Sequence, residues 1–291
     1  MLAPKPILIV LLGTAATAFV AFWIGRARGT PGWRRPTWRQ LAIGFVTNFF
    51  DMLGIGSFAP TTALYKLGRV VPDENIPGTL NVGHLIPTFV EAVISILVIA
   101  VDVEPRTLIL LIAASVAGAW LGAGVVAGWS RRRIQLGMGV LLLGAVAVMI
   151  ARQTGLVPSG GEALGLSGTR LAIGIACNFV LGAFMTLGVG LFAPCMIMVA
   201  LLGMQETAAF PIMMGSCAFL MPAASVRFVR SGRYDLRASL GLTLAGAPAV
   251  LLAAFVVKSL ALRTVKWLVV VVVVYTAVAM LRSSVRERRS G

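Results

Sequence analysis

Long apolar stretches recur from one end of the chain to the other, and each is long enough to cross a hydrocarbon core roughly 30 Å thick. Of the 291 residues, 58% are hydrophobic and only 12% are charged. Runs such as Val269–Val274 lack the alternation of polar and apolar residues that barrel strands require. Seven or more such stretches predict a polytopic α-helical protein of the lipid bilayer, and they exclude soluble, disordered and disulfide-stapled secreted classes.

The basic residues are concentrated in short connections between the apolar stretches. The chain has 25 Lys and Arg against 10 Asp and Glu, a net charge of +15. This distribution is typical of the positive-inside rule, and it predicts a cytoplasmic C-terminus. Because no basic domain with interleaved aromatic residues lies outside the apolar stretches, we expect no nucleic-acid partner.

The three cysteines, Cys177, Cys195 and Cys217, all lie in apolar segments of the second half. They form no CxxC or Cys/His pattern, so the sequence predicts neither a disulfide nor a metal site. A P-loop is also absent, and we expect no ATP hydrolysis, no catalytic residues and no cofactor. The first apolar stretch, Ile7–Ile24, favours a retained helix over a cleaved signal peptide, since only Lys5 precedes it.

An internal repeat divides the chain. The octapeptide Leu53–Pro60 (LGIGSFAP) returns 134 positions later as Leu187–Pro194 (LGVGLFAP). Upstream of it, the tetrapeptide LAIG and a following asparagine return 130 positions later, so the second copy carries four more residues, about one helical turn. We expect an N-terminal transmembrane helix and basic loop over 1–39, repeat 1 over 40–151, a linker over 152–169, repeat 2 over 170–282 and a basic cytoplasmic tail over 283–291.

The shared Gly-x-Gly-x-Phe-Ala-Pro motif predicts a break between two short helices, because Gly disfavours a helix interior and Pro suits a first helical turn. Each pair of arms forms either one broken crossing helix or a re-entrant hairpin. The re-entrant arrangement places more of the 25 basic residues on one side, and we favour it. The predicted hairpins cover 40–68 and 170–203, and the predicted full spans cover 6–25, 75–101, 107–129, 133–151, 207–229, 237–257 and 263–281.

Each half then contains one hairpin and three full spans, and this odd number of crossings inverts the second half relative to the first. The predicted fold is an all-α polytopic membrane protein with two inverted repeats and one extra N-terminal helix. Paired breaks at matching points of inverted repeats are the best sequence indication of a transporter's binding site. Non-helical backbone at membrane depth is tolerated only where it is buried in protein or lines a cavity.

The two hairpin tips are predicted to meet and to point helix N-termini, with free N–H groups and a positive dipole end, at a small anion. Ser57 is a candidate N-cap for the second arm of the first hairpin. Asn48 and Asn178 share one repeat position and either contact the ligand or join helices to each other. The predicted substrate-binding residues are Asn48, Gly54, Gly56, Ser57, Thr61, Thr62, Asn178, Gly188, Gly190 and Cys195.

Three titratable residues lie within apolar stretches and are candidates for proton coupling. Glu91 either carries a coupling proton or forms an ion pair with Arg227. Asp51 either takes part in coupling or caps backbone N–H groups at the hairpin tip. His84, the only histidine, is either a hydrogen-bonded structural residue or a proton relay.

Ser57 and His84 also suggest an intramembrane serine hydrolase, with Ser57 as nucleophile and His84 as base. The repeat argues against it, because the second copy has Leu191 at the Ser position and Ala218 near the His position. Both halves preserve the glycines and the proline, which determine backbone shape. We therefore expect a protein that is not an enzyme.

A Gly-rich break before Pro, followed by a helix that carries Gly78-Thr79, resembles the TauE/SafE family of sulfite exporter-like membrane proteins over about residues 40–282. The chain departs from the family pattern in two places. Gly-Ile-Gly-Ser stands where the family has a glycine triplet, and Met213-Met214 stands where Gly-Thr is expected in the second repeat. The resemblance implies a bacterial inner-membrane carrier that exports sulfite, an organosulfonate or another small sulfur-containing anion. An anion channel and a non-transporting membrane scaffold are the alternatives, and the sequence leaves a homodimer open.

Overall fold

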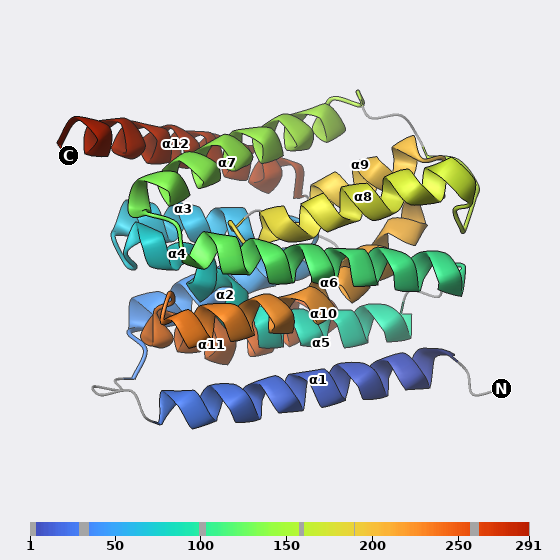
Figure 1. The fold of residues 1–291 in the computed structure, drawn as a ribbon, viewed down its shortest axis with the longest axis horizontal. Coiled ribbons are helices and arrows are strands. Elements are labelled where there is room, and N and C mark those ends of the chain that lie inside the picture. The colour runs from blue at the N-terminus through green and yellow to red at the C-terminus, as the bar shows by residue number, and fades with distance from the viewer. Residues whose placement is uncertain are drawn as a thin grey trace.

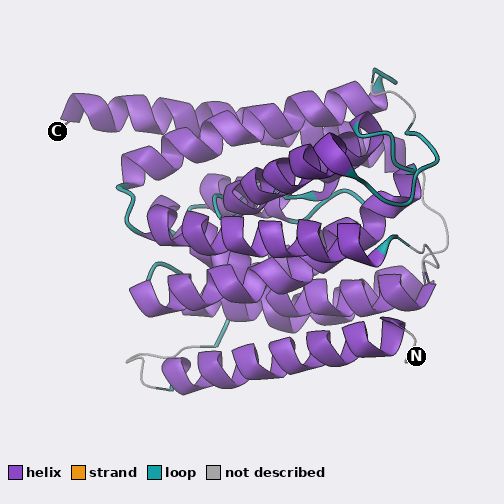
Figure 2. Cartoon of the chain, turned by 45° about the vertical axis from the view of Figure 1, so that its right-hand side comes forward, coloured by secondary structure: helices purple, strands orange, loops and turns teal. Residues whose placement is uncertain are grey.

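Helices make up all the regular structure in the described part of the chain, apart from an isolated bridge between Ala163 and Met204. The structure is a computed structural model, and it describes residues 4–28, 35–98, 103–156, 160–188, 190–256 and 262–290. The long helices run roughly side by side in a layered bundle (Figures 1 and 2).

The first half of the chain contains short helices between long ones. Its second helix begins at a capping box, in which Thr37 and Gln40 exchange hydrogen bonds of 2.9 and 3.2 Å between side chain and backbone. The elements of this half are α1 (Pro4–Ala27), α2 (Trp38–Met52), α3 (Phe58–Gly68), η1 (Asp73–Asn75), α4 (Ile76–Gly83), α5 (Leu85–Val98), α6 (Pro105–Ala127) and α7 (Arg131–Gln153).

The second half repeats this order with fewer interruptions. Its first helix has 18 residues against 15 in α2, which agrees with the insertion of one helical turn that the repeat predicts. The elements are α8 (Gly168–Met185), α9 (Phe192–Leu201), η2 (Glu206–Ala208), α10 (Ala209–Ser231), α11 (Leu236–Val256) and α12 (Leu262–Ser290).

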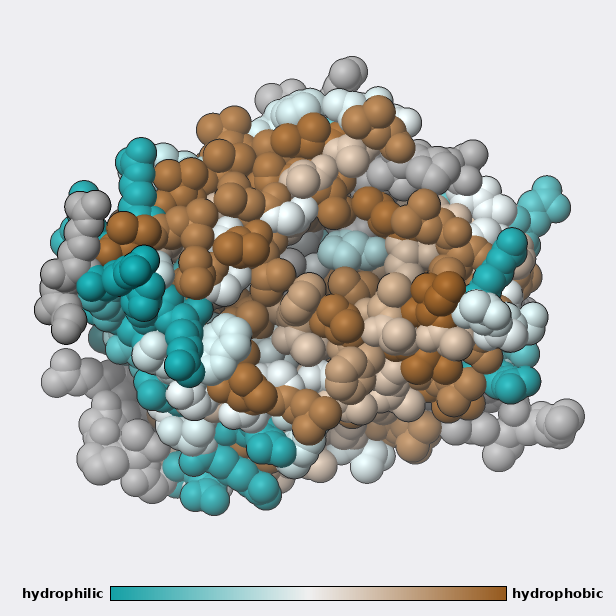
Figure 3. All heavy atoms as spheres, turned by 45° about the horizontal axis from the view of Figure 1, so that its top comes forward, coloured by the Kyte–Doolittle hydropathy of each residue, from teal (hydrophilic) through white to brown (hydrophobic). Residues whose placement is uncertain are grey.

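Seven of the described helices are long and apolar enough to cross a membrane, which agrees with the predicted multi-pass membrane protein. They are α1, α6, α7, α8, α10, α11 and α12. The face in Figure 3 has a broad apolar band between hydrophilic ends, as expected for a surface that contacts lipid. These seven helices differ from the predicted spans in two ways. Helix α8 is long enough to cross a membrane, although it was predicted to be an arm of a hairpin, and none of the seven corresponds to the predicted span 75–101.

The predicted span 75–101 is wrong as one continuous helix. A 3-10 turn precedes α4, and α4 ends at Gly83, just before α5 begins at Leu85. Pro87 has no N–H to donate to the carbonyl of Gly83 one turn earlier. Thr243 of α11 donates its hydroxyl to this carbonyl instead, at 2.9 Å. Residues 99–102 lie outside the described residues.

Helices from the two halves pack on each other in reciprocal pairs. Helix α2 packs along α11, and α8 packs along α6, while α7 packs along α12. The crossings of the first two pairs are so close that they require glycine. A Cβ atom at Gly118 of α6 would lie 1.9 Å from the carbonyl oxygen of Phe179, and one at Gly44 of α2 would lie 2.6 Å from that of Gly241.

Candidate functional site

Both predicted helix breaks are present, and glycine makes them possible. Gly54 and Gly56 have φ values of +85° and +90° between α2 and α3, and Gly188 has a φ of +91° between α8 and α9. Side chains other than glycine rarely adopt this region. The glycines therefore turn the backbone where α2 and α8 end.

The two breaks lie against each other. A Cβ atom at Gly190 would lie 3.9 Å from the Cβ of Phe58, which begins α3. One at Gly188 would lie 3.6 Å from the hydroxyl oxygen of Thr62 and 3.0 Å from Leu80 Cδ1. The break of the second half thus packs on the first turns of α3.

A small cavity of about 40 Å³ lies where the breaks meet. This volume holds about three water molecules. Five of the predicted site and coupling residues line the cavity: Asp51, Gly56, Ser57, Glu91 and Gly190. The other lining residues are Phe58, Thr88, Met185, Leu191, Met213, Met214 and Cys217, none of which was predicted as a site residue.

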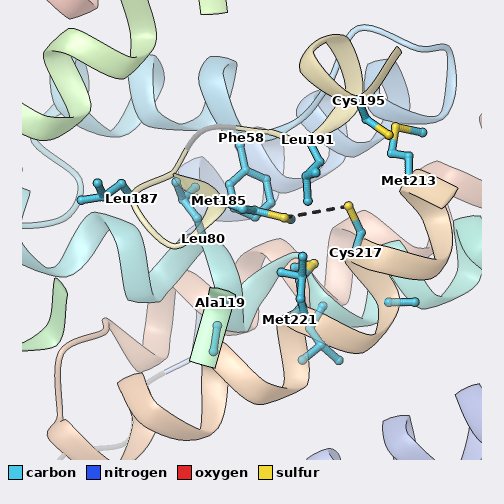
Figure 4. Close-up of a cluster of buried hydrophobic side chains, with 14 of the residues drawn as sticks. Phe58, Leu80, Ala119, Met185, Leu187, Leu191, Cys195, Met213, Cys217 and Met221 are labelled. Carbon is cyan, nitrogen blue, oxygen red and sulfur yellow. Dashed lines mark hydrogen bonds between the residues drawn. The ribbon is translucent and has the colours of Figure 1, made fainter. Parts of the chain in front are cut away.

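Sulfur atoms form one wall of this site. The Cys217 thiol donates to the Met185 sulfur at 3.9 Å, and both side chains are buried. Figure 4 shows Met185, Leu191 and Cys217 gathered near Phe58, with Cys195 and Met213 beside them. Among the described residues, no group of three or more His, Cys, Asp and Glu is placed to hold a metal ion.

Asp51 and Ser57 interact across the first break. The carboxyl of Asp51 interacts with both the hydroxyl and the backbone N–H of Ser57. Asp51 thus lies at the N-terminal end of α3, where its predicted capping role requires it. Ser57 is the N-cap residue of α3, as predicted, but its side chain makes no capping hydrogen bond, because Ser57 has helical backbone angles rather than the extended ones typical of a capping residue.

Glu91 reaches the cavity from α5. Its side chain is 3% exposed, and its Oε1 atom has no hydrogen-bond partner among the described residues. The predicted ion pair with Arg227 is not formed in the described structure. The Arg227 guanidinium instead lies 4.2 Å from the ring centre of Trp120 on α6, where a cation–π contact stabilises it.

His84 lies beside the cavity in a complete hydrogen-bond network. Asn48 donates its amide to the carbonyl of Gly44 at 2.7 Å, so its oxygen accepts from His84 Nδ1 at 2.9 Å. His84 Nε2 then accepts from the hydroxyl of Thr61 at 3.1 Å. All three side chains are buried, and together they join α2, α3 and the α4–α5 junction.

We expect His84→Ala to destabilise the protein and to leave the pH profile of any solute flux that the protein supports unchanged. Asn48 and Thr61 would each lose a buried partner, at about 1–3 kcal/mol per unsatisfied group. Thermal unfolding in detergent should show a midpoint lowered by several degrees. An unchanged midpoint with an altered pH profile would instead identify His84 as a proton relay.

The remaining predicted residues do not line the cavity. Asn178 donates to the carbonyl of Leu111 at 2.6 Å and to the hydroxyl of Ser216 at 3.0 Å, and thereby joins α8 to α6 and α10. Cys195 is fully buried and does not line the cavity. Thr62 is also buried, and its hydroxyl has no partner in the described structure.

Two of the cavity-lining residues that were not predicted, Thr88 and Met185, could have been found from their spacing to predicted residues. Thr88 lies three residues before Glu91, so the two share a helix face. Met185 occupies the repeat position of Asp51, 134 residues later.

Comparisons with known proteins find no match to a family model, a curated protein or a solved structure.

Proposed function

We propose that this protein is a secondary transporter for a small anion, with its binding site between the two helix breaks. The observation that carries the proposal is the cavity lined by Asp51, Gly56 and Ser57 from one half and by Gly190 and Leu191 from the other. Discontinuous helices that meet inside a bundle are typical of transporter binding sites. In the proposed mechanism, the halves move apart to bind and release a solute at this cavity of about 40 Å³.

In this proposal, the halves 40–151 and 170–282 are inverted repeats that rock against each other around the cavity. Reciprocal contacts support a twofold relation. Gly118 of α6 lies against Phe179, next to Asn178 of α8, and its repeat counterpart Gly246 of α11 lies against Asn48 of α2. After exchange of the halves, the corresponding helices thus approach each other at positions one residue apart in the repeat.

We place the anion at the N-terminal end of α9. Among the described residues, no Lys, Arg or His side chain lines the cavity, and helix ends are the source of positive potential in this proposal. Asp51 already occupies the end of α3, through Ser57. The corresponding position before α9 is Met185, which carries no charge, and the α9 cap residue Leu191 makes no side-chain hydrogen bond. An exogenous anion would take the place there that Asp51 takes in the first half.

The resemblance to the TauE/SafE family favours a sulfur-containing anion, such as sulfite or an organosulfonate, and transport out of the cell. In this arrangement, the protein lies in a bacterial inner membrane with its basic C-terminal end in the cytoplasm. It acts without a cofactor and is not an enzyme, and two copies form a homodimer through lipid-facing helices.

We expect Glu91→Gln to uncouple transport from a proton gradient. Glu91 offers an unpartnered carboxyl oxygen at the cavity, and glutamine keeps its shape but cannot exchange a proton. In proteoliposomes, an imposed pH gradient should accelerate anion flux in the wild type and leave the flux of the variant unchanged. The matched control is Glu206→Gln, which removes an exposed carboxyl and should keep the response to the pH gradient. A gradient response that survives in Glu91→Gln would exclude Glu91 as the proton carrier.

The proposed function is tested by flux of sulfite, sulfoacetate, sulfate and thiosulfate into proteoliposomes, with and without a pH gradient. A transporter gives saturable flux that one of these anions supports. Flux that rises without saturation would indicate a channel, and no flux of any of them would favour a membrane scaffold.

A further inference from the structure

A second site lies along one face of α12 and shares no lining residue with the central cavity. The residues of this face recur three or four positions apart, so they form a continuous stripe along the helix. The stripe changes character along its length. It is apolar at Val271, Val274 and Val278, and becomes polar at Arg282, Ser283 and Arg286.

The stripe forms one wall of an open crevice of about 1240 Å³. The opposite wall consists of the C-terminal end of α3 and the segment that follows it, from Lys66 to Asp73, together with Arg131 at the start of α7. The basic residues of both walls therefore gather at one end of the crevice. Val271 and Tyr275 at its other end are 64% and 63% exposed, on a helix of membrane-spanning length.

Asp73 is the only acid among the described residues that line the crevice, and its charge is already neutralised. Asp73 forms ion pairs with Lys66 and with Arg131, the latter at 3.7 Å, and also accepts a hydrogen bond from Gln135 at 2.7 Å. Two exposed arginines, Arg69 and Arg282, make no ion pair with any residue that the structure describes. The basic end of the crevice thus has two positive charges available for an external anion.

We propose that this crevice binds one anionic phospholipid, with its phosphate at Arg69 and Arg282 and an acyl chain along Val271, Val274 and Val278. A basic end followed by an apolar wall, in the direction of a membrane-spanning helix, matches the order of groups in a phospholipid. Basic pockets between transmembrane helices at a cytoplasmic surface are suited to anionic headgroups. The site is independent of the central cavity, so it stands whether or not the protein transports anions.

The test uses the full-length protein purified in detergent and titrated with phosphatidylglycerol, with bound lipid counted by native mass spectrometry. Each basic residue near a membrane surface contributes about 1 kcal/mol to binding of anionic lipid, so the double variant Arg69→Ala/Arg282→Ala should bind about 30-fold more weakly. Val278→Trp, which fills the apolar wall, should also weaken binding. Because the two arginines are exposed and unpaired, their removal should leave the thermal unfolding midpoint unchanged.

The matched control is Arg132→Ala/Arg288→Ala, which removes two exposed arginines that do not line the crevice. We expect it to bind phosphatidylglycerol like the wild type, and phosphatidylcholine to bind neither protein specifically. Equal losses in the control would overturn the proposal, because they would show a general attraction to positive charge. Displacement of the lipid by millimolar inorganic phosphate would also overturn it, in favour of a site for soluble anions.

Discussion

Gly190→Leu is expected to abolish anion flux while the protein remains folded. Gly190 lines the cavity and faces Phe58 of the other half, with room for a Cβ atom at ordinary contact distance, 3.9 Å. A leucine side chain fits this backbone position but is larger than the cavity of about 40 Å³. It should therefore occupy the space that the solute needs. Flux of the preferred anion in proteoliposomes should fall below the detection limit, with a normal elution profile and unfolding midpoint.

The matched control is Gly144→Leu. Gly144 lies on an exposed face of α7, and a Cβ atom there would have no neighbour within 4 Å. This variant introduces the same side chain far from the cavity and should keep wild-type flux. Normal flux in Gly190→Leu, measured on folded protein, would show that the solute does not pass between the helix breaks.

The second large effect concerns stability. Gly118→Ala should destabilise the protein severely, because a Cβ atom at this position would lie 1.9 Å from the carbonyl oxygen of Phe179. Backbone cannot move aside as a flexible side chain can, so α6 and α8 would have to separate. We expect a loss of about 3 kcal/mol, which lowers the thermal unfolding midpoint by roughly 10 °C.

The repeat relation adds a prediction for the other half. Gly246→Ala should also destabilise, because its Cβ would lie 2.5 Å from the Asn48 amide nitrogen, but less so, since this neighbour is a side chain. Gly144→Ala serves as the control and should be neutral. A wild-type midpoint for Gly118→Ala would contradict the close crossing of α6 and α8.

The sequence predicts the elements that local chemistry determines. The glycines and prolines of LGIGSFAP and LGVGLFAP locate both helix breaks, because positive φ and the first helical turn favour these residues wherever the chain leads. The extra turn of α8 likewise follows from the difference between 130 and 134 in the repeat spacings. These features depend on residues that are adjacent in the chain, so one sequence is enough to predict them.

The features that the sequence could not predict depend on partners distant in the chain. Thr243, 160 residues away, supplies the hydrogen bond that compensates for Pro87 and allows the α4–α5 break. Arg227 packs on Trp120 rather than on Glu91, because α10 crosses α6 and brings these two side chains together. The sulfur atoms at the cavity could not be predicted either, because Met185 and Cys217 resemble ordinary core residues in the sequence and only the fold brings them to the cavity.

In the proposed mechanism, the solute passes between two helix breaks that touch in one state and part in another. A direct test is a disulfide between Phe58→Cys and Gly190→Cys, in a background with Cys177, Cys195 and Cys217 replaced by Ala. The Cβ separation of 3.9 Å lies within the range of disulfides. A protease site in the loop between α7 and α8 makes the bond visible, because only cross-linked halves migrate together after cleavage.

We predict that oxidation joins the two fragments and stops anion flux, and that reduction separates the fragments and restores flux. Each single-cysteine variant should show neither effect. Fragments that never join would contradict the contact between the breaks, and undiminished flux through fully cross-linked protein would contradict their role in transport.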